Sequence, residues 1–147
     1  MVKLLGVSIE RLEQKDIITR IQKAERSLFI VTLNPEILLH AWHDEHYRKI
    51  LNEADVRVVD GIGIVIMAKL LYGITLKRFP GADLAEELVK LAAREKKKIF
   101  LLGGNDEANR RAIKRIKKQE VRITGLGGTF SQEQAMGAIN NSQADII

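Results

Sequence analysis

Seven residues suited to catalysis or ligand binding follow short apolar runs of the sequence. They provide one carboxylate, one hydroxyl, one amide and four glycines, namely Asp60, Thr32, Asn34, Gly61, Gly103, Gly104 and Gly127. A carboxylate can act as a general base. Glycine lets the backbone approach a ligand closely, and free N–H groups at helix starts attract phosphate. These residue types predict a nucleotide-like ligand.

Each of these residues also has a purely structural interpretation. Asp60 is either a helix N-cap or a general base, and its position after residues 56–59 suits both roles equally. Thr32 and Asn34 are either strand-end and capping residues or ligand contacts, and the glycine pairs at 103–104 and 127–128 can be tight turns. Neither pair completes a G-x-G-x-x-G motif or a P-loop, which disfavours a dinucleotide or ATP site of the usual kind.

The apolar runs that precede these residues are expected to be strands. They cover residues 28–31, 56–59, 99–102 and 121–124, with a further run at 4–7. Stretches with apolar residues three and four apart lie between them and predict helices. Ligands bind beyond the carboxyl ends of parallel strands covered by helices on both faces. We therefore predict one α/β domain over residues 1–147, with a Rossmann-like, open, mainly parallel sheet and helices on both faces.

Capping residues mark the expected helix boundaries. Asn34-Pro35-Glu36 predicts a helix start, because Asn caps free amides and Pro suits the first helical position. Residues 79–83 open another helix that runs to about Lys96, and Gly73 is a candidate C′ residue. Residues 144–147 read as the first half of a strand, so we expect the chain to be cut short.

The amino-acid composition excludes several classes of protein and of functional site. The 147 residues include no cysteine, which excludes a disulfide scaffold, a thiolate metal site and a cysteine nucleophile. No apolar run approaches the roughly 20 residues of a membrane span, and the N-terminus lacks the apolar region of a signal peptide. The net charge of +5 favours an anionic partner.

Residues 110–118 form an expected amphipathic helix with a basic outer face, and Lys96-Lys97-Lys98 adds further charge. A solvated face is the plain interpretation. Anionic lipid headgroups are the better functional alternative, because each cation near such a surface adds about 1 kcal/mol. Nucleic acid is disfavoured, because aromatic residues are 5% of the chain and do not interleave with the basic run.

Three histidines follow Pro35 at three-residue spacing. His40, His43 and His46 are expected on one helix, where the third points well away from the first. They therefore do not converge on one metal ion, and an ordinary helix face is the favoured interpretation.

Several motifs in order resemble the WecG/TagA/CpsF glycosyltransferase family. They are Val31-Thr32-Leu33-Asn34-Pro35-Glu36-Ile37, Asn52-Glu53-Ala54-Asp55 leading into Val59-Asp60-Gly61-Ile62-Gly63-Ile64-Val65, Arg78-Phe79-Pro80-Gly81-Ala82-Asp83-Leu84 and Phe100-Leu101-Leu102-Gly103-Gly104. The resemblance covers essentially the whole chain. It implies a single catalytic domain that lacks the family's C-terminal segment and basic tail.

The resemblance implies an inverting enzyme that transfers N-acetylmannosamine from a UDP donor to undecaprenyl-diphosphate-linked N-acetylglucosamine. The product is a β-1,4 bond, formed in synthesis of the wall teichoic acid linkage unit or a related surface polysaccharide. Asp60 matches the family's candidate base, with Thr32 beside it as a catalytic residue. The implied substrate-binding residues are Asn34, Gly61, Arg78, Gly81, Asp83, Gly103, Gly104 and Gly127. No metal or other cofactor is expected.

The same resemblance implies a peripheral enzyme at the cytoplasmic face of the cell membrane. Its expected partners are the UDP-sugar, the lipid-linked acceptor and an anionic membrane surface, with a homodimer possible. Three rival hypotheses stay open at this point: a non-catalytic nucleotide-binding module, a transferase that uses another UDP-sugar such as N-acetylmannosaminuronic acid, and a basic nucleic-acid-binding or interaction domain.

Overall fold

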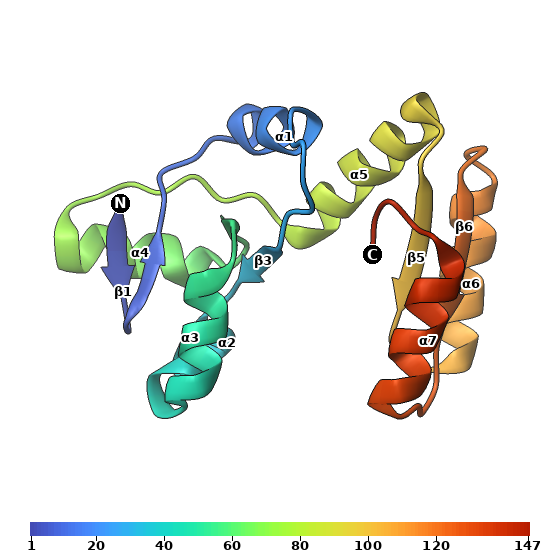
Figure 1. Cartoon of the computed structure of the whole chain (residues 1–147). Coiled ribbons are helices and arrows are strands. Elements are labelled where there is room, and N and C mark those ends of the chain that lie inside the picture. Colours follow the sequence, from blue (N-terminus) through green and yellow to red (C-terminus); the bar gives the residue numbers. More distant parts are fainter. The chain divides into compact units, whose positions relative to one another are not determined.

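The computed structural model describes residues 1–147 as two compact units, Met1–Leu84 and Ala85–Ile147. Figure 1 shows helices and short strands in both, so the α/β class is confirmed. The strands pair in three two-stranded sheets. Two of these pairs are parallel, whereas the single Rossmann-like sheet and the single domain stay predictions.

The first unit begins with a β-hairpin. Strands β1 (Val2–Leu4) and β2 (Val7–Ile9) pair antiparallel. The sequence-based prediction of one strand over residues 4–7 is wrong, because Leu5 and Gly6 form the turn with φ values of 47° and 84°. Two successive residues with positive φ are typical of the tight turn that joins hairpin strands.

A parallel strand pair follows helix α1 (Gln14–Gln22). Strands β3 (Ile30–Leu33) and β4 (Val56–Val59) align Ile30 with Val56 and Leu33 with Val59. The predicted strand over 56–59 is confirmed, whereas the strand predicted over 28–31 begins two residues later. Thr32 consequently lies within β3, and Asp60 directly follows β4.

Helices α2 (Pro35–His43) and α3 (Glu45–Glu53) connect these two strands. Asp44 ends α2 and caps α3, where its Oδ1 accepts a hydrogen bond of 2.9 Å from Tyr47 N. The prediction of one helix carrying all three histidines is therefore wrong, since His46 lies on α3. The His40 ring contacts that of Tyr47 edge to face, with centroids 4.7 Å apart.

Helix α4 (Ile62–Tyr72) follows β4 and packs against the hairpin. Gly73 ends α4 in the left-handed conformation, with φ of 66°, as its predicted C′ role requires. The core of the first unit joins the hairpin, β3, β4, α2, α3 and α4. Its most enclosed side chains include Leu4, Ile9, Leu33, Leu38 and Ile64.

The second unit is built on strands β5 (Lys98–Leu102) and β6 (Arg122–Leu126), which are parallel. Helix α5 (Gly81–Glu95) spans the division between the units, and its first turn belongs to the first unit. Helices α6 (Asp106–Lys117) and α7 (Gln132–Ser142) complete the second unit. Ile146 forms a parallel bridge with Ile99, which agrees with the strand start predicted at 144–147.

None of the helices is long and apolar enough to cross a bilayer.

Candidate functional site

The pair Thr32 and Asp60 marks the carboxyl ends of neighbouring strands in the first unit. Asp60 N donates a hydrogen bond of 2.8 Å to Leu33 O, which fixes the chain directly after β4 to the end of β3. The Asp60 side chain is 33% exposed and Thr32 is half-buried, so both are within reach of a ligand. Ligands of parallel sheets bind at this end of the strands.

Asp60 does not cap a helix in this structure. The N-cap residue of α4 is Gly61, and no side chain bonds to the first turn of that helix. The carboxylate is therefore not engaged in the capping role that the sequence left open. Its oxygens accept no hydrogen bond within the chain, and Oδ1 lies 3.9 Å from Arg78 Nη2.

Gly81 brings a third element to the pair. A β-carbon built on Gly81 would lie 3.1 Å from Asp60 Oδ2 and 3.2 Å from Thr32 Cγ2. The segment before α5 is held there because Phe79 N donates a hydrogen bond of 2.8 Å to Val59 O. Asp60, Thr32 and the amino end of α5 thus converge, and the absence of a side chain at Gly81 permits this close approach.

The Arg78 side chain also contacts Asp60. Its Nε donates a hydrogen bond of 2.5 Å to Asp60 O, and Nη2 lies 3.9 Å from Asp60 Oδ1. The side chain remains 48% exposed, so part of its guanidinium faces solvent. Arginine in such a position can bind a phosphate or a carboxylate through paired N–H groups. Asp83 follows on the first turn of α5 and is exposed.

Asn34 fulfils the capping alternative. Its Oδ1 accepts a hydrogen bond of 2.8 Å from Ile37 N at the start of α2. The capping prediction for Asn34-Pro35-Glu36 is confirmed, and the role of Asn34 toward a sugar stays a prediction.

Gly61 is a site of close backbone packing. A β-carbon on Gly61 would lie 2.5 Å from Pro35 Cδ, and one on Gly63 would lie 2.7 Å from Pro35 Cγ. The two glycines therefore let the amino end of α4 press against the first residue of α2. This packing joins the loop that carries Asp60 to the loop that carries Asn34.

Gly103 and Gly104 form the turn between β5 and α6 in the second unit. Their φ values are 102° and 70°, which L-residues rarely adopt. Gly103 N donates to Leu126 O, and Gly128 N donates to Gly104 O, both at 2.9 Å. The turn interpretation of this pair thus holds, whether or not a ligand also binds there.

Gly127 packs against the first turn of α6. A β-carbon there would lie 2.7 Å from Asn109 Cβ and 3.1 Å from Asn105 O. The three glycines Gly103, Gly104 and Gly127 gather at the carboxyl ends of β5 and β6. A common edge shared with Asp60 stays a prediction.

Asn109 is a buried polar residue that the sequence reasoning missed. It is 4% exposed, and its Nδ2 donates hydrogen bonds of 3.1 Å to Leu101 O and 2.9 Å to Gly103 O. It therefore holds the ends of β5 and the glycine turn against α6. Its spacing before Ile113 and Ile116 was the available signal, because a polar residue in an apolar stripe needs buried partners.

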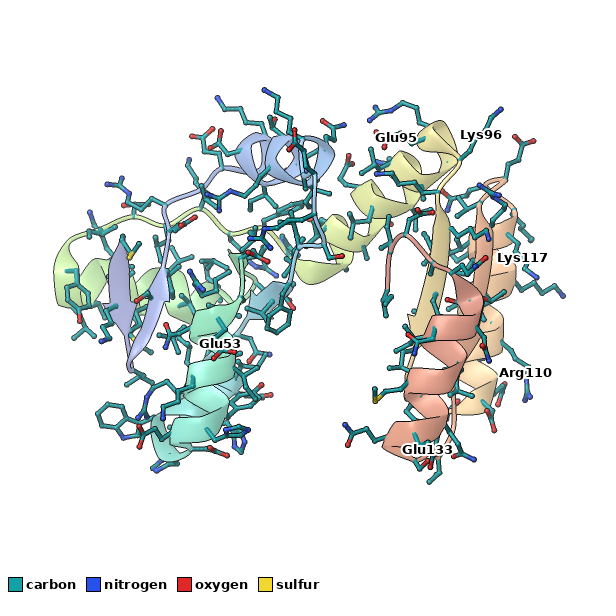
Figure 2. All side chains as sticks on the ribbon, viewed as in Figure 1. Glu53, Glu95, Lys96, Arg110, Lys117 and Glu133 are labelled. Atoms are coloured by element: carbon teal, nitrogen blue, oxygen red, sulfur yellow. The ribbon has the colours of Figure 1, made fainter.

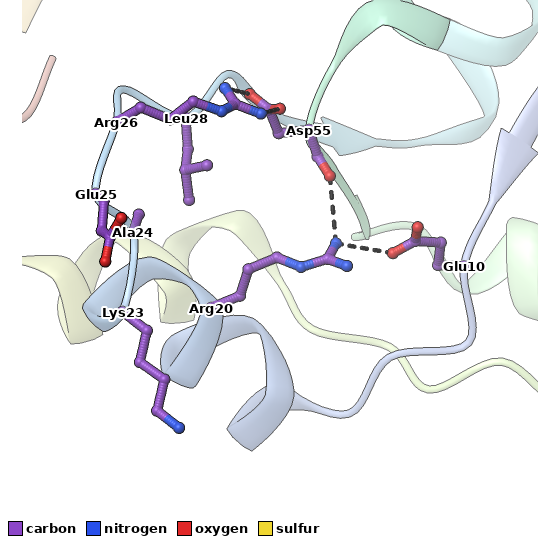
Figure 3. Close-up of a pocket in the computed structure, with 8 residues that line it drawn as sticks. All are labelled: Glu10, Arg20, Lys23, Ala24, Glu25, Arg26, Leu28 and Asp55. Carbon is purple, nitrogen blue, oxygen red and sulfur yellow. Dashed lines mark hydrogen bonds and ion pairs between the residues drawn. The ribbon is translucent and has the colours of Figure 1, made fainter.

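A hollow of about 820 Å³ opens at the other end of the β3–β4 pair, near residues that precede the strands. Figure 3 shows that its charged groups are largely paired with one another. Arg20 Nη1 donates to Glu10 Oε2 at 2.9 Å and to Asp55 O at 3.3 Å. These bonds brace the fold, and the hollow lies at the amino ends of the strands, where parallel sheets do not usually bind ligands.

Asp55 is the best-paired carboxylate of that hollow. The hydrogen bond from Arg26, followed by that from Phe29 N at 2.8 Å, holds the pKa of Asp55 below its ordinary value. The same bond raises the pKa of Arg26. Asp55 and Asp60 thus flank β4 with different surroundings, since the Asp55 carboxylate accepts hydrogen bonds and the Asp60 carboxylate accepts none but lies 3.9 Å from Arg78 Nη2.

No group of three histidine, cysteine or acidic side chains is placed to hold a metal ion.

The basic residues of α6 are exposed, and Figure 2 shows Arg110 and Lys117 projecting from that helix. The acidic first turn, Asp106 and Glu107, and the basic last turn of α6 both suit the helix dipole.

Comparison with known proteins gives one family and a consistent set of relatives. Residues 2–147 match the model described as the Glycosyl transferase WecG/TagA/CpsF family. A Staphylococcus aureus protein of strain MRSA252, named N-acetylglucosaminyldiphosphoundecaprenol N-acetyl-beta-D-mannosaminyltransferase, is 33% identical over 116 residues. That match covers 76% of this chain and 46% of the relative.

A protein of the same name from Staphylococcus aureus strain NCTC 8325 / PS 47 is 33% identical over 111 residues. The match covers 72% of this chain and 44% of that relative. The chain thus spans less than half the length of the curated relatives it matches.

Proposed function

Because the chain belongs to the WecG/TagA/CpsF glycosyltransferase family, we propose that it forms the catalytic part of an N-acetylmannosaminyltransferase. The donor is UDP-N-acetylmannosamine, and the acceptor is undecaprenyl-diphosphate-linked N-acetylglucosamine. The names of the relatives support this choice of acceptor and transferred sugar. The enzyme works at the cytoplasmic face of the membrane, in synthesis of the wall teichoic acid linkage unit or a related polysaccharide.

The observation that carries the proposal is the convergence of Thr32, Asp60 and Gly81. In a single displacement, a carboxylate oxygen of Asp60 accepts the proton of the acceptor's 4-hydroxyl as that oxygen attacks the anomeric carbon. The bond from the anomeric carbon to UDP breaks, and its electron pair leaves with the diphosphate. Attack opposite to the leaving group inverts the configuration and gives the β-1,4 bond. Thr32 lies beside Asp60 and positions the sugar.

The departing diphosphate gains negative charge and needs donors nearby. The exposed guanidinium of Arg78 and the backbone N–H groups at the amino end of α5, from Gly81 to Asp83, lie next to Asp60 and can supply them. Asn34 and Gly61 lie in the two neighbouring loops that follow β3 and β4. We expect no metal or other cofactor to be needed.

The glycine turns of the second unit extend this scheme. If β3, β4, β5 and β6 belong to one Rossmann-like sheet, then Gly103, Gly104 and Gly127 also face the donor. The exposed cations of α6 are a proposed contact with anionic lipid.

Replacement of Asp60 by Asn tests the base. In the protein at its natural length, supplied with a short-chain lipid-diphosphate acceptor, D60N is expected to lower kcat by about 10²–10⁴-fold. The Kd of UDP-N-acetylmannosamine is expected to stay nearly unchanged, because Asn has almost the same volume as Asp and the proposed role of residue 60 is toward the acceptor hydroxyl and not the uridine.

The matched control is D55N, since Asp55 precedes the strand that Asp60 follows. We expect D55N to retain the turnover of the native protein at neutral pH. Native turnover in D60N would remove Asp60 as the base. Donor binding without transfer by the native protein would instead favour a nucleotide-binding module, and faster transfer from UDP-N-acetylmannosaminuronic acid would change the donor.

A further inference from the structure

Helix α4 carries a large apolar face that nothing in the first unit covers. Ile62, Ile66 and Leu70 are spaced four residues apart, so they share one side of the helix, and they are 59%, 52% and 79% exposed. Ile64 and Ala68 lie on the other side and are completely buried against the hairpin and β4. The sequence of α4 is therefore apolar on both sides, although only one side contributes to the core.

The carboxyl end of α4 extends this face with Leu71 and Tyr72, which are also exposed. The Tyr72 hydroxyl donates a hydrogen bond of 2.8 Å to Lys3 O on β1, so the ring is held at the edge of the face. A tyrosine with one apolar and one hydrogen-bonded end is typical of positions at a lipid–water boundary. We call the exposed residues Ile62, Ile66, Leu70, Leu71 and Tyr72 the α4 apolar face.

Helix α4 and the hairpin on which it packs carry cations and no acidic residue, and the acidic residues nearest to them in the sequence are Glu10, Asp60 and Asp83. Residues 61–82 contain no Asp or Glu, and their only charged residues are Lys69, Lys77 and Arg78. The hairpin that packs on α4 likewise has no acidic residue within residues 1–9, and it contributes the exposed Lys3. An exposed apolar face whose own helix and neighbouring hairpin carry cations and no acidic residue matches an anionic lipid surface.

A second copy of this chain matches the α4 apolar face less well. In a symmetric pair the same patch meets itself, so Lys69 and its neighbours would face like charges. A nucleic acid is also a poor match, because aliphatic side chains do not provide the stacking platforms that bases require.

The position of α4 relative to the candidate base gives this face a function. Asp60 lies two residues before Ile62, so the apolar face begins at the site. A helix lying in the plane of the membrane surface would hold Asp60 near the lipid headgroups. The diphosphate and sugar of a lipid-linked acceptor lie at that level.

We propose that α4 is an in-plane membrane helix that docks the protein on anionic bilayers through its apolar face. The inference rests on the proposed function in one respect: a lipid-linked acceptor explains why the protein needs to dock on a membrane. It differs from the contact with anionic lipid proposed for the cations of α6, because α6 offers no large exposed apolar side chain to insert.

Binding to vesicles tests the proposal without any need for catalysis. The chain is mixed with phosphatidylcholine vesicles that contain or lack phosphatidylglycerol, and the bound fraction is measured by sedimentation. We expect the native chain to bind the anionic vesicles more tightly. The double variant I66Q/L70Q is expected to reduce the partition coefficient about tenfold or more, because two side chains no longer enter the apolar region.

Two control variants sharpen the result. L39Q replaces an exposed leucine of α2 that is 55% exposed, close to the 52% of Ile66, and we expect it to bind like the native chain. K69Q is expected to weaken binding about fivefold on anionic vesicles and not on neutral ones. Thermal unfolding should be alike in all variants, since the replaced side chains are exposed.

Native vesicle binding by I66Q/L70Q would overturn the proposal, as would an equal loss in L39Q. It would also be overturned by a dimer that I66Q/L70Q dissociates in the absence of vesicles, because the face would then be a self-association surface. D60N should bind vesicles normally and I66Q/L70Q should bind UDP normally. Failure of the docking proposal and failure of the transferase proposal therefore give different results.

Discussion

Arg78 and Asp60, eighteen residues apart in the chain, are joined through the Asp60 backbone. The Arg78 Nε donates to the Asp60 carbonyl oxygen at 2.5 Å, and its Nη2 lies 3.9 Å from the carboxylate. The arginine is thus anchored by one nitrogen, while its outer nitrogens remain beside the carboxylate and solvent. This arrangement allows one side chain to hold the Asp60 loop and contact a substrate anion.

Substitution R78Q is expected to lower kcat/KM for the donor about 10–100-fold, as expected for loss of a charge-assisted hydrogen bond. The neighbouring K77Q removes the same charge from an exposed residue and should change kcat/KM little with a short-chain acceptor in solution. Steady-state kinetics over a range of donor concentrations would check this. Equal effects of both substitutions would show that only the overall charge matters.

A methyl group at Gly81 is expected to lower turnover without lowering the stability of the fold. In G81A the new β-carbon would lie 3.1 Å from Asp60 Oδ2 and 3.2 Å from Thr32 Cγ2, so the Asp60 and Thr32 side chains would have to shift by a few tenths of an ångström. We expect turnover to fall about 10–100-fold through misplacement of the reacting groups. Thermal unfolding should change little.

The control for Gly81 is G137A in α7, where a new β-carbon would meet no atom within 4 Å. It should raise the free energy of unfolding by up to about 1 kcal/mol, because Ala favours a helix interior over Gly. Activity should remain native. A G81A protein with native turnover would show that the reaction does not depend on the present placement of the Asp60 and Thr32 side chains.

The sequence was sufficient to place Thr32 and Asp60 near the same ends of two strands, because Asp60 directly follows one apolar run and Thr32 lies near the end of another. It was also sufficient for the Asn34 cap and the Gly73 helix end, which depend on local backbone chemistry. It could not place Gly81 and Arg78 against Asp60. Their approach depends on the path of residues 73–80, which contain no regular element and whose course is set by tertiary packing.

Other local features were hidden for different physical reasons. The turn at Leu5-Gly6 interrupts an otherwise apolar run, and only the positive φ of both residues reveals it. The break between α2 and α3 falls at Asp44, whose capping side chain competes with the helical pattern around it. The site roles of Asn34, Gly103, Gly104 and Gly127 remain predictions, because capping, turn geometry and close packing already account for these residue types.

Asp55 predicts how stability responds to acid. Its pKa lies below the ordinary value of 3.8 in the folded chain, chiefly because of the hydrogen bond from Arg26. The stabilisation is therefore fully present above pH 3.8 and is lost as the pH falls through the lower, folded-state pKa. Urea unfolding at several pH values should show that D55N is less stable than the native chain at neutral pH.

The difference between native and D55N chains should shrink progressively in acid below pH 3.8. E53Q is the control, since Glu53 is exposed and forms no ion pair or side-chain hydrogen bond. A native–D55N difference that stays constant down to the acid limit of the folded state would contradict the assignment.

Asn109 should matter for stability far more than an exposed asparagine. N109A removes the donor to the Leu101 and Gly103 carbonyl oxygens and is expected to lower the free energy of unfolding by about 1–3 kcal/mol. N141A on the exposed side of α7 should change it by less than about 0.7 kcal/mol. Urea denaturation compares the two, and equal effects would show that the buried amide is dispensable.

The packing of Pro35 between Gly61 and Gly63 has a thermodynamic consequence for ligand binding. Because the Pro35 ring packs directly on the backbone of two glycines, the chain around Asp60 has few alternative conformations in the folded protein. The entropic cost of orienting that carboxylate is therefore met when the polypeptide first folds, before the proposed donor binds. Binding should then proceed with little ordering of this loop, and any large unfavourable entropy measured by calorimetry would have to originate in other segments.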